Sequence, residues 1–99
     1  MKYVTTDGTT AIVSIDGRFD LIKTLEVEQE INDAIHQRGC DAITFDLAST
    51  RYIDSSANRL MKKSRDIIGA ENFSVINVTA TAVRKALKTA KLDILFRIQ

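Results

Sequence analysis

The sequence predicts an α/β fold, in which helices pack on a mixed β-sheet of four to five strands. Three observations support this prediction. Apolar residues alternate with polar ones over short runs, as at positions 11–15 and 43–47. Between these runs, apolar residues recur every three or four positions, and such strand-then-helix order is typical of layered α/β domains. The 99 residues contain no proline and no low-complexity linker, so we expect one domain over residues 1–99.

The first elements are a hairpin, a loop and a helix. Alternation over residues 11–16 predicts a strand, and Tyr3 and Val4 begin its partner across an Asp7-Gly8 turn. Residues 17–20 form a loop. The helix after it ends at Gly39, since glycine is the usual terminating residue. The positions on its packed face are Leu25, Val27, Ile31, Ala34, Ile35 and Arg38.

The next elements are a strand, a polar turn and a second helix. Residues 43–47 alternate as a strand, and a polar turn leads from it to Asp54. The helix after Asp54 ends at Gly69. Its apolar face consists of Leu60, Met61, Ser64, Ile67 and Ile68.

The pattern in the last part of the chain predicts a third clear strand and a third helix. Residues 73–78 form the strand, and Thr79 or Thr81 caps the helix. One face of this helix carries Ala82, Val83, Ala86, Leu87 and Ala90. Residues 92–98 finish the chain as a short turn and an edge strand.

Composition indicates a cytoplasmic protein without direct membrane insertion. No apolar run approaches the roughly 20 residues that cross a bilayer, and no signal peptide pattern is present. The single cysteine, Cys40, cannot form an internal disulfide, which fits a reducing compartment. As a metal ligand Cys40 has only His36 nearby in sequence, so we expect a buried or half-buried apolar side chain and no metal site.

Charge is distributed unevenly along the chain. Residues 1–50 carry nine acidic and four basic side chains, whereas residues 51–99 carry four acidic and ten basic ones. Two interpretations remain open: these are solvated helix faces, or one side of the domain is basic and meets an acidic partner.

Catalysis and nucleic-acid binding have little support. The only histidine, His36, has no serine or cysteine nucleophile near it in sequence, and no phosphate-binding glycine motif exists, so we predict a non-enzyme without cofactors. The basic residues after position 50 lack a stacking platform of aromatic side chains, which argues against a nucleic-acid partner. A phosphoaspartate receiver with Asp46 as acceptor lacks an acidic pair near the first strand.

The most informative segment is Asp54-Ser55-Ser56 at the start of the second helix. If Asp54 caps this helix, the two serines occupy its first turn, where backbone N–H groups are unpaired and the helix dipole favours negative charge. One hydroxyl is expected to project into solvent. A hydroxyl in this place can cap the helix, act as a nucleophile, or carry a phosphate.

Three segments resemble the STAS domain, the family of bacterial anti-sigma factor antagonists. Gly17-Arg18-Phe19-Asp20 is similar to its Gly-x-x-Asp loop. The strand, turn and Asp-Ser-Ser of residues 45–56 resemble its signature. Residues 83–87 and 92–96 resemble its closing helix and tail. The segments occur in the family's order and span nearly the whole chain.

The resemblance implies a partner-switching regulator with Ser56 as phosphoacceptor. In that family a serine kinase is also the anti-sigma-type binding partner, and a metal-dependent phosphatase removes the phosphate. The unmodified domain binds the kinase and frees what the kinase held, commonly a sigma factor, although the output is another process in some relatives. A second implied role is a constitutive subunit of a lipid-transport ABC complex, which needs no phosphorylation.

The chain departs from the family pattern directly after the serines. The family usually continues with Gly-Leu-Gly-Val, whereas Ala57, Asn58, Arg59 and Leu60 stand here. Alanine has a higher helix propensity than glycine by about 1 kcal/mol, so Ala57 favours a stiffer first turn. We predict a docking surface on the loop and the exposed side of this helix. Its residues are Gly17, Arg18, Phe19, Asp20, Asp54, Ser55, Asn58, Arg59, Lys62 and Lys63.

Overall fold

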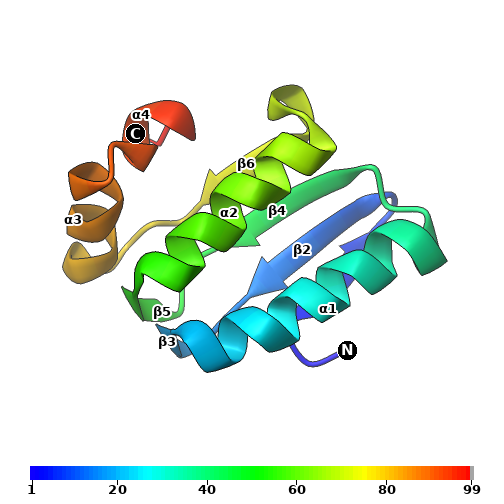
Figure 1. Ribbon diagram of the computed structural model, residues 1–99, viewed down its shortest axis with the longest axis horizontal. Coiled ribbons are helices and arrows are strands. Elements are labelled where there is room, and N and C mark those ends of the chain that lie inside the picture. The colour runs from blue at the N-terminus through cyan, green and yellow to red at the C-terminus, as the bar shows by residue number, and fades with distance from the viewer. Residues whose placement is uncertain (99) are drawn as a thin grey trace.

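The computed structural model describes residues 1–98, and within them strands and helices alternate as Figure 1 shows. The strands are β1 (Val4–Asp7), β2 (Thr10–Ser14), β3 (Gly17–Phe19), β4 (Ala42–Asp46), β5 (Thr50–Ile53) and β6 (Phe73–Ile76). The helices are α1 (Leu21–Arg38), α2 (Ser55–Ile68), the 3-10 helix η1 (Ala70–Asn72), α3 (Thr81–Thr89) and α4 (Leu92–Leu95).

The main sheet is mixed, with the strand order β1-β2-β4-β6. β1 and β2 form the predicted hairpin, with residues 8–9 as its two-residue turn and Gly8 in the left-handed conformation that such turns require. β2, β4 and β6 run parallel, so α1 and α2 serve as the crossover connections. β3 and β5 form a separate two-stranded parallel sheet. The structure therefore confirms the predicted α/β fold.

The helices α1 and α2 lie side by side over one face of the main sheet (Figure 1). The sheet residues that face them, such as Val13 and Phe45, are fully buried. Ser14 and Ile76, which point to the opposite face, are exposed. Within the described residues the sheet is thus covered on one face and open on the other, as mixed sheets with antiparallel edges permit.

Four phenylalanines connect the two sheets with the C-terminal helix. Phe19 of β3 stacks on Phe45 of β4 at 6.1 Å between ring centroids, and Phe45 contacts Phe73 of β6 at 5.8 Å. Phe73 in turn contacts Phe96, directly after α4, at 5.1 Å. Each aromatic pair adds about 0.5–1.5 kcal/mol beyond the area that it buries. This row fixes the small β3–β5 sheet, which carries the candidate site, to the core.

A glutamate from α1 binds backbone donors at the start of β1. Glu30 Oε1 accepts hydrogen bonds from Tyr3 N at 2.9 Å and from Val4 N at 3.0 Å. Unpaired backbone groups of an edge strand invite pairing with another chain, and a side chain that occupies them prevents it.

Two segments predicted as loop and turn are in fact strands. Within residues 17–20, predicted as a loop, Gly17–Phe19 form β3, and the polar turn before Asp54 contains β5. Neither strand shows a clear alternation, because each is short and pairs only with the other. The buried hydroxyl of Thr50 donates to Ile15 O at 2.7 Å and fastens β5 to the end of β2. Tertiary pairing therefore decides a local structure that the sequence pattern does not.

The prediction for the C-terminal part was also partly wrong. The expected edge strand within residues 92–98 is instead the short helix α4, because Leu92 and Phe96 point to one buried side at helical spacing. The expected threonine cap of α3 is absent, since Ala80 is the N-cap residue and makes no side-chain bond. Thr79 instead donates its hydroxyl to Ala48 O at 3.1 Å.

One leucine and one isoleucine that were predicted on packed helix faces are exposed. Leu25 of α1 is 62% exposed and Ile67 of α2 is 59% exposed. The buried residues of α1 are Thr24, Val27, Ile31 and Ala34, and those of α2 are Ser56, Ala57, Leu60, Met61 and Ser64. In both helices the apolar residues exceed what one narrow stripe against the sheet can bury.

Candidate functional site

Strands β3 and β5 bring the starts of α1 and α2 to one place. The two strands run parallel, and Phe19 lies opposite Ile53 at their ends. One aspartate follows each strand, Asp20 or Asp54, and a helix begins directly after it. Asp54 N also donates to Phe19 O at 3.3 Å. Two helix N-termini, each with unpaired N–H groups and a positive dipole end, therefore lie next to each other.

The carboxylate of Asp54 caps both helices. Its Oδ1 accepts from Ala57 N at 3.0 Å, and its Oδ2 accepts from Leu21 N at 3.1 Å. Asp20 caps α1 alone, with Oδ1 accepting from Lys23 N at 3.2 Å. The predicted capping role of Asp54 is confirmed. The contribution of Asp20 and Asp54 to a docking surface stays a prediction.

The two serines after Asp54 differ in exposure. Ser55 is exposed, whereas Ser56 is only 9% exposed. The Ser56 hydroxyl has no hydrogen-bond partner within residues 1–98. It lines a groove between α1 and α2. The expected hydroxyl in free solvent is therefore that of Ser55, and Ser56 instead faces the groove, because the second position of α2 turns toward α1.

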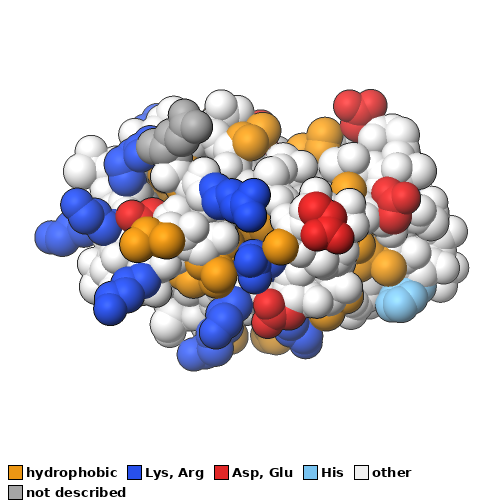
Figure 2. All heavy atoms as spheres, turned by 90° about the horizontal axis from the view of Figure 1, so that it is seen from above, with side chains coloured by type: hydrophobic (Ala, Val, Ile, Leu, Met, Phe, Trp, Pro, Cys, Tyr) orange, Lys and Arg blue, Asp and Glu red, His pale blue; other side chains and the backbone are white. Residues whose placement is uncertain are grey.

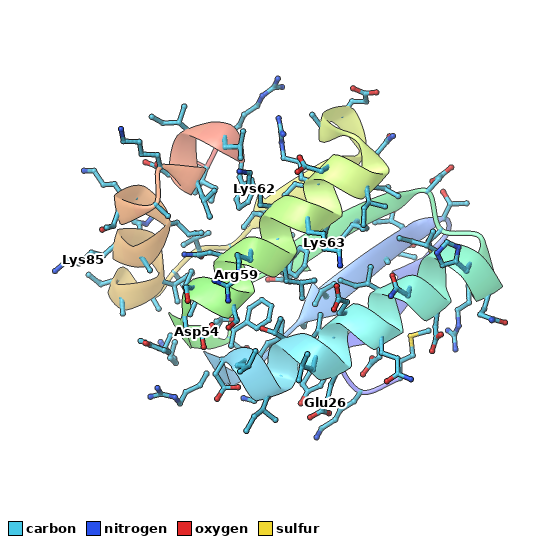
Figure 3. All side chains as sticks on the ribbon, viewed as in Figure 1. Glu26, Asp54, Arg59, Lys62, Lys63 and Lys85 are labelled. Atoms are coloured by element: carbon cyan, nitrogen blue, oxygen red, sulfur yellow. The ribbon has the colours of Figure 1, made fainter. Side chains whose placement is uncertain are left out.

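The groove between the helices has a volume of about 270 Å³ and mixed chemistry. Its lining residues are Leu21, Thr24 and Glu28 of α1 and Ser56, Arg59, Leu60 and Lys63 of α2. Lys63 Nζ donates to Glu28 Oε2 at 2.6 Å, so an ion pair joins the two helices across the groove. In Figure 3, Lys63 points from α2 toward α1, and Arg59 lies nearer the start of α2.

An exposed apolar surface adjoins the groove at the start of α1. We call Leu21, Ile22 and Leu25 the α1 patch; their exposed fractions are 54%, 71% and 62%. Contiguous apolar side chains in solvent indicate an interaction surface rather than chance exposure. This patch was not predicted from the sequence, because Leu25 was assigned to the packed face of the helix. The sequence signal for it is that Leu21, Ile22 and Leu25 are apolar residues at helical spacing in the first turns of α1.

The structure removes one residue from the predicted docking surface. Phe19 has no exposed area, because its ring packs in the core against Phe45, so it cannot contact a partner. Its neighbour Arg18 is exposed and lies over the ring of Tyr52, with 4.4 Å between its guanidinium carbon and the ring centroid. Gly17 is half-buried in β3 and has φ of 70°, which favours glycine.

The other predicted contact residues lie on α2. Arg59 and Lys62 are exposed, and Lys63 is exposed although it pairs with Glu28. Asn58 is half-buried, and its Oδ1 is a buried acceptor without a partner within residues 1–98. These residues share one helix but not one surface, since only Arg59 and Lys63 line the groove with Ser56.

Basic and acidic side chains gather in different parts of the molecular surface. On the face shown in Figure 2, Lys and Arg side chains gather toward the end of the molecule formed by α3 and α4, and most of the visible Asp and Glu side chains lie toward the other end. Arg59 and Lys62 of α2 lie between these ends (Figure 3). Arg59 and Lys62 thus give the exposed side of α2 positive charge.

Other residues weighed in the sequence lie apart from this site. Cys40 is buried in the core, as predicted, and His36 is exposed on α1. Asp46 Oδ1 accepts from Ala48 N and from Asn77 Nδ2 at the end of β4. In the described part of the chain, no group of three or more His, Cys, Asp or Glu side chains is placed to hold a metal ion. None of the described helices is long and apolar enough to span a bilayer.

The family model of the STAS domain matches residues 1–99. No curated protein matches the chain in sequence. Solved structures match in fold. One is an anti-sigma factor antagonist from Mycobacterium paratuberculosis, with a TM-score of 0.77 and 23% identity over 94% of this chain and 79% of that chain.

Two further structures have similar folds at lower identity. A putative anti-sigma factor antagonist from Thermotoga maritima gives a TM-score of 0.78 at 15% identity, over 93% of this chain and 80% of that one. The anti-sigma factor antagonist SpoIIAA in its unphosphorylated form gives 0.68 at 17% identity, over 92% and 93%. At these identities the likeness establishes the fold.

Proposed function

Because the chain belongs to the STAS domain family, we propose that it is a partner-switching regulator of the anti-sigma factor antagonist type. In the unmodified form it binds a serine kinase that is also an anti-sigma-type regulator, in the cytoplasm. The bound kinase then releases what it held, a sigma factor or the component of another process. The chain itself acts by binding and has no catalytic role.

One observation carries this proposal: the Asp54-Ser55-Ser56 turn lies where two helix N-termini meet, beside the exposed α1 patch. A switch needs an acceptor hydroxyl next to a contact surface, so that one modification changes the contact. Ser56 borders both the groove and Leu21 of the patch.

The surface indicates the chemistry of the partner. The α1 patch supplies an apolar centre, and Arg18, Arg59 and Lys62 are exposed cations on the neighbouring elements. A complementary kinase surface therefore has an apolar centre with an acidic rim. Apolar contacts at the centre supply most of the affinity of such interfaces, and rim charges mainly guide encounter and orientation.

Phosphorylation would change this surface without unfolding the domain. The kinase transfers the γ-phosphoryl group of ATP to Ser56 Oγ, which loses its proton, and ADP leaves. A phosphoserine carries about −1.5 to −2 charges near neutral pH, and a helix N-terminus stabilises such a group. An acidic partner rim is then repelled. A metal-dependent phosphatase resets the switch by hydrolysing the ester.

The test compares variants of Ser56 for fold and for kinase binding. The kinase is identified by cross-linking to the tagged chain in its native cells, and binding is measured by calorimetry with the purified kinase. Ser56→Ala is expected to stay folded and bind, whereas Ser56→Asp and Ser56→Glu stay folded and bind poorly. Thr9→Asp is the control, because Thr9 is exposed in the turn between β1 and β2 and is not part of the predicted docking surface. Equal affinity for all Ser56 variants would remove the switch.

Mass spectrometry of the chain from native cells separates this role from that of a constitutive transport subunit. A phosphoryl group on Ser56 supports the switch. Its absence under every growth condition, together with co-purification of an ABC ATPase, would favour the constitutive role.

A further inference from the structure

The groove between α1 and α2 combines an unpaired hydroxyl with two cationic side chains. Ser56 is 9% exposed and lacks a hydrogen-bond partner among residues 1–98, although it lines the groove. Arg59 and Lys63 line the same groove. Lys63 Nζ already donates across the groove to Glu28 Oε2 of α1, at 2.6 Å.

We propose that a phosphoryl group on Ser56 is held inside this groove by Arg59 and Lys63, and that Lys63 exchanges Glu28 for the phosphate. The inference rests on the proposed function, since it concerns the modified form of Ser56. It adds an internal binding site for the phosphate, formed by Lys63 and by Arg59, which stands where the family pattern has glycine.

The spacing along α2 places both cations within reach. Arg59 follows Ser56 by three residues, so the two side chains are neighbours on one helix face. Lys63 follows Ser56 by two helical turns, roughly 10 Å along the axis, and the long side chain of lysine together with the phosphate spans this separation. The groove, with its volume of about 270 Å³, leaves room for the phosphate between them.

The exchange of partners is favourable because the existing ion pair is weak. The side chains of Lys63 and Glu28 are 61% and 31% exposed, and ion pairs this open to solvent contribute little. The phosphate offers about −1.5 to −2 charges and three acceptor oxygens. Arg59 can bind it with two parallel hydrogen bonds, and the N-terminus of α2 adds its dipole. Asp54 and Glu28 are the anions beside the groove that oppose this binding.

In this proposal, phosphorylation makes a cation of the docking surface unavailable to the partner. In the modified form Arg59 and Lys63 are held by the phosphate, so Arg59 is lost to an acidic partner. Glu28 loses its partner and becomes a free carboxylate beside the α1 patch. The partner therefore loses the attraction of Arg59 and meets added negative charge at the same surface.

The test uses the full chain with phosphoserine inserted at position 56 during translation, so that no kinase is required. The second pKa of the phosphoserine, about 6 in the absence of neighbours, is measured by phosphorus NMR titration. The double substitution Arg59→Gln and Lys63→Gln is expected to raise this pKa by about one unit, a tenfold change in acidity. Glu28→Gln is expected to lower it, because the substitution removes a carboxylate that lines the groove and opposes the charge of the phosphate.

Two controls separate a specific site from the general field of the protein. Lys62→Gln removes one positive charge outside the groove and is expected to shift the pKa by less than a third as much. Phosphoserine at position 55, outside the groove, is expected to respond to the double substitution by less than a third as much. Circular dichroism verifies that each variant is folded.

An unchanged pKa in the folded double variant overturns the proposal, as does an equal shift for Lys62→Gln. Such a failure is distinct from failure of the proposed function, which is decided by kinase binding and not by this titration.

Discussion

Asp54 connects the two helix starts, because each of its carboxylate oxygens accepts a different backbone N–H. Asp54→Asn keeps one oxygen for Ala57 N but turns an amide NH₂ toward Leu21 N–H, so that two donors oppose each other. Asparagine caps a helix as well as aspartate does. The expected loss is therefore the Leu21 hydrogen bond, about 1–2 kcal/mol of the free energy of unfolding. Asp54→Ala removes both bonds and costs about 2–3 kcal/mol.

Asp20→Asn is the matched control for this prediction. Asp20 uses one oxygen, for Lys23 N, and asparagine retains that bond. In a thermal unfolding experiment, 1 kcal/mol corresponds to about 4–8 °C of Tm for a domain of this size. Asp54→Asn is expected to lower Tm by roughly 4–16 °C, and Asp20→Asn by under about 2 °C. Equal Tm values for the two variants would refute the double capping by Asp54.

Two further substitutions test the sheet that carries the site and the docking surface. Thr50→Val removes the buried hydroxyl that donates to Ile15 O, and it is expected to lower the free energy of unfolding in urea by about 1–2 kcal/mol; an unchanged value would show that this bond does not hold β5. Ile22→Asp is expected to leave stability within about 0.5 kcal/mol, since Ile22 is 71% exposed, but to weaken kinase binding at least about tenfold. Ile67→Asp, at an exposed isoleucine far along α2, is its control, and equal losses of affinity would contradict a role for the α1 patch.

The sequence was sufficient for the elements whose residues pack by a regular period. Alternation predicted β2 and β4, Gly39 ended α1 in the left-handed conformation, and Asp54 capped α2. These features depend on local chemistry, so neighbouring residues determine them. β3, β5 and α4 were not predicted, because short elements gain their stability from distant partners such as the pairing of Phe19 with Ile53.

For the candidate site, too, the sequence predicted the features set by local chemistry and not those set by tertiary packing. The motif located Ser56 on the correct turn, but not its orientation, which depends on how α1 packs against α2. Phe19 was placed on a docking surface because the motif contains it, yet its ring belongs to the core. The α1 patch was missed because an apolar residue on an amphipathic helix is normally assigned to the buried side. Which of two apolar stripes meets the sheet is a tertiary property.

The affinity of the kinase for two forms of the chain, one with serine and one with phosphoserine at position 56, tests the central claim most directly. A loss of about 3 kcal/mol on phosphorylation is expected, which weakens binding by more than about a hundredfold. Both forms are expected to give the same circular dichroism spectrum, because the N-terminus of α2 stabilises the phosphate without unfolding of the domain. The same dissociation constant for the two folded forms would contradict the account.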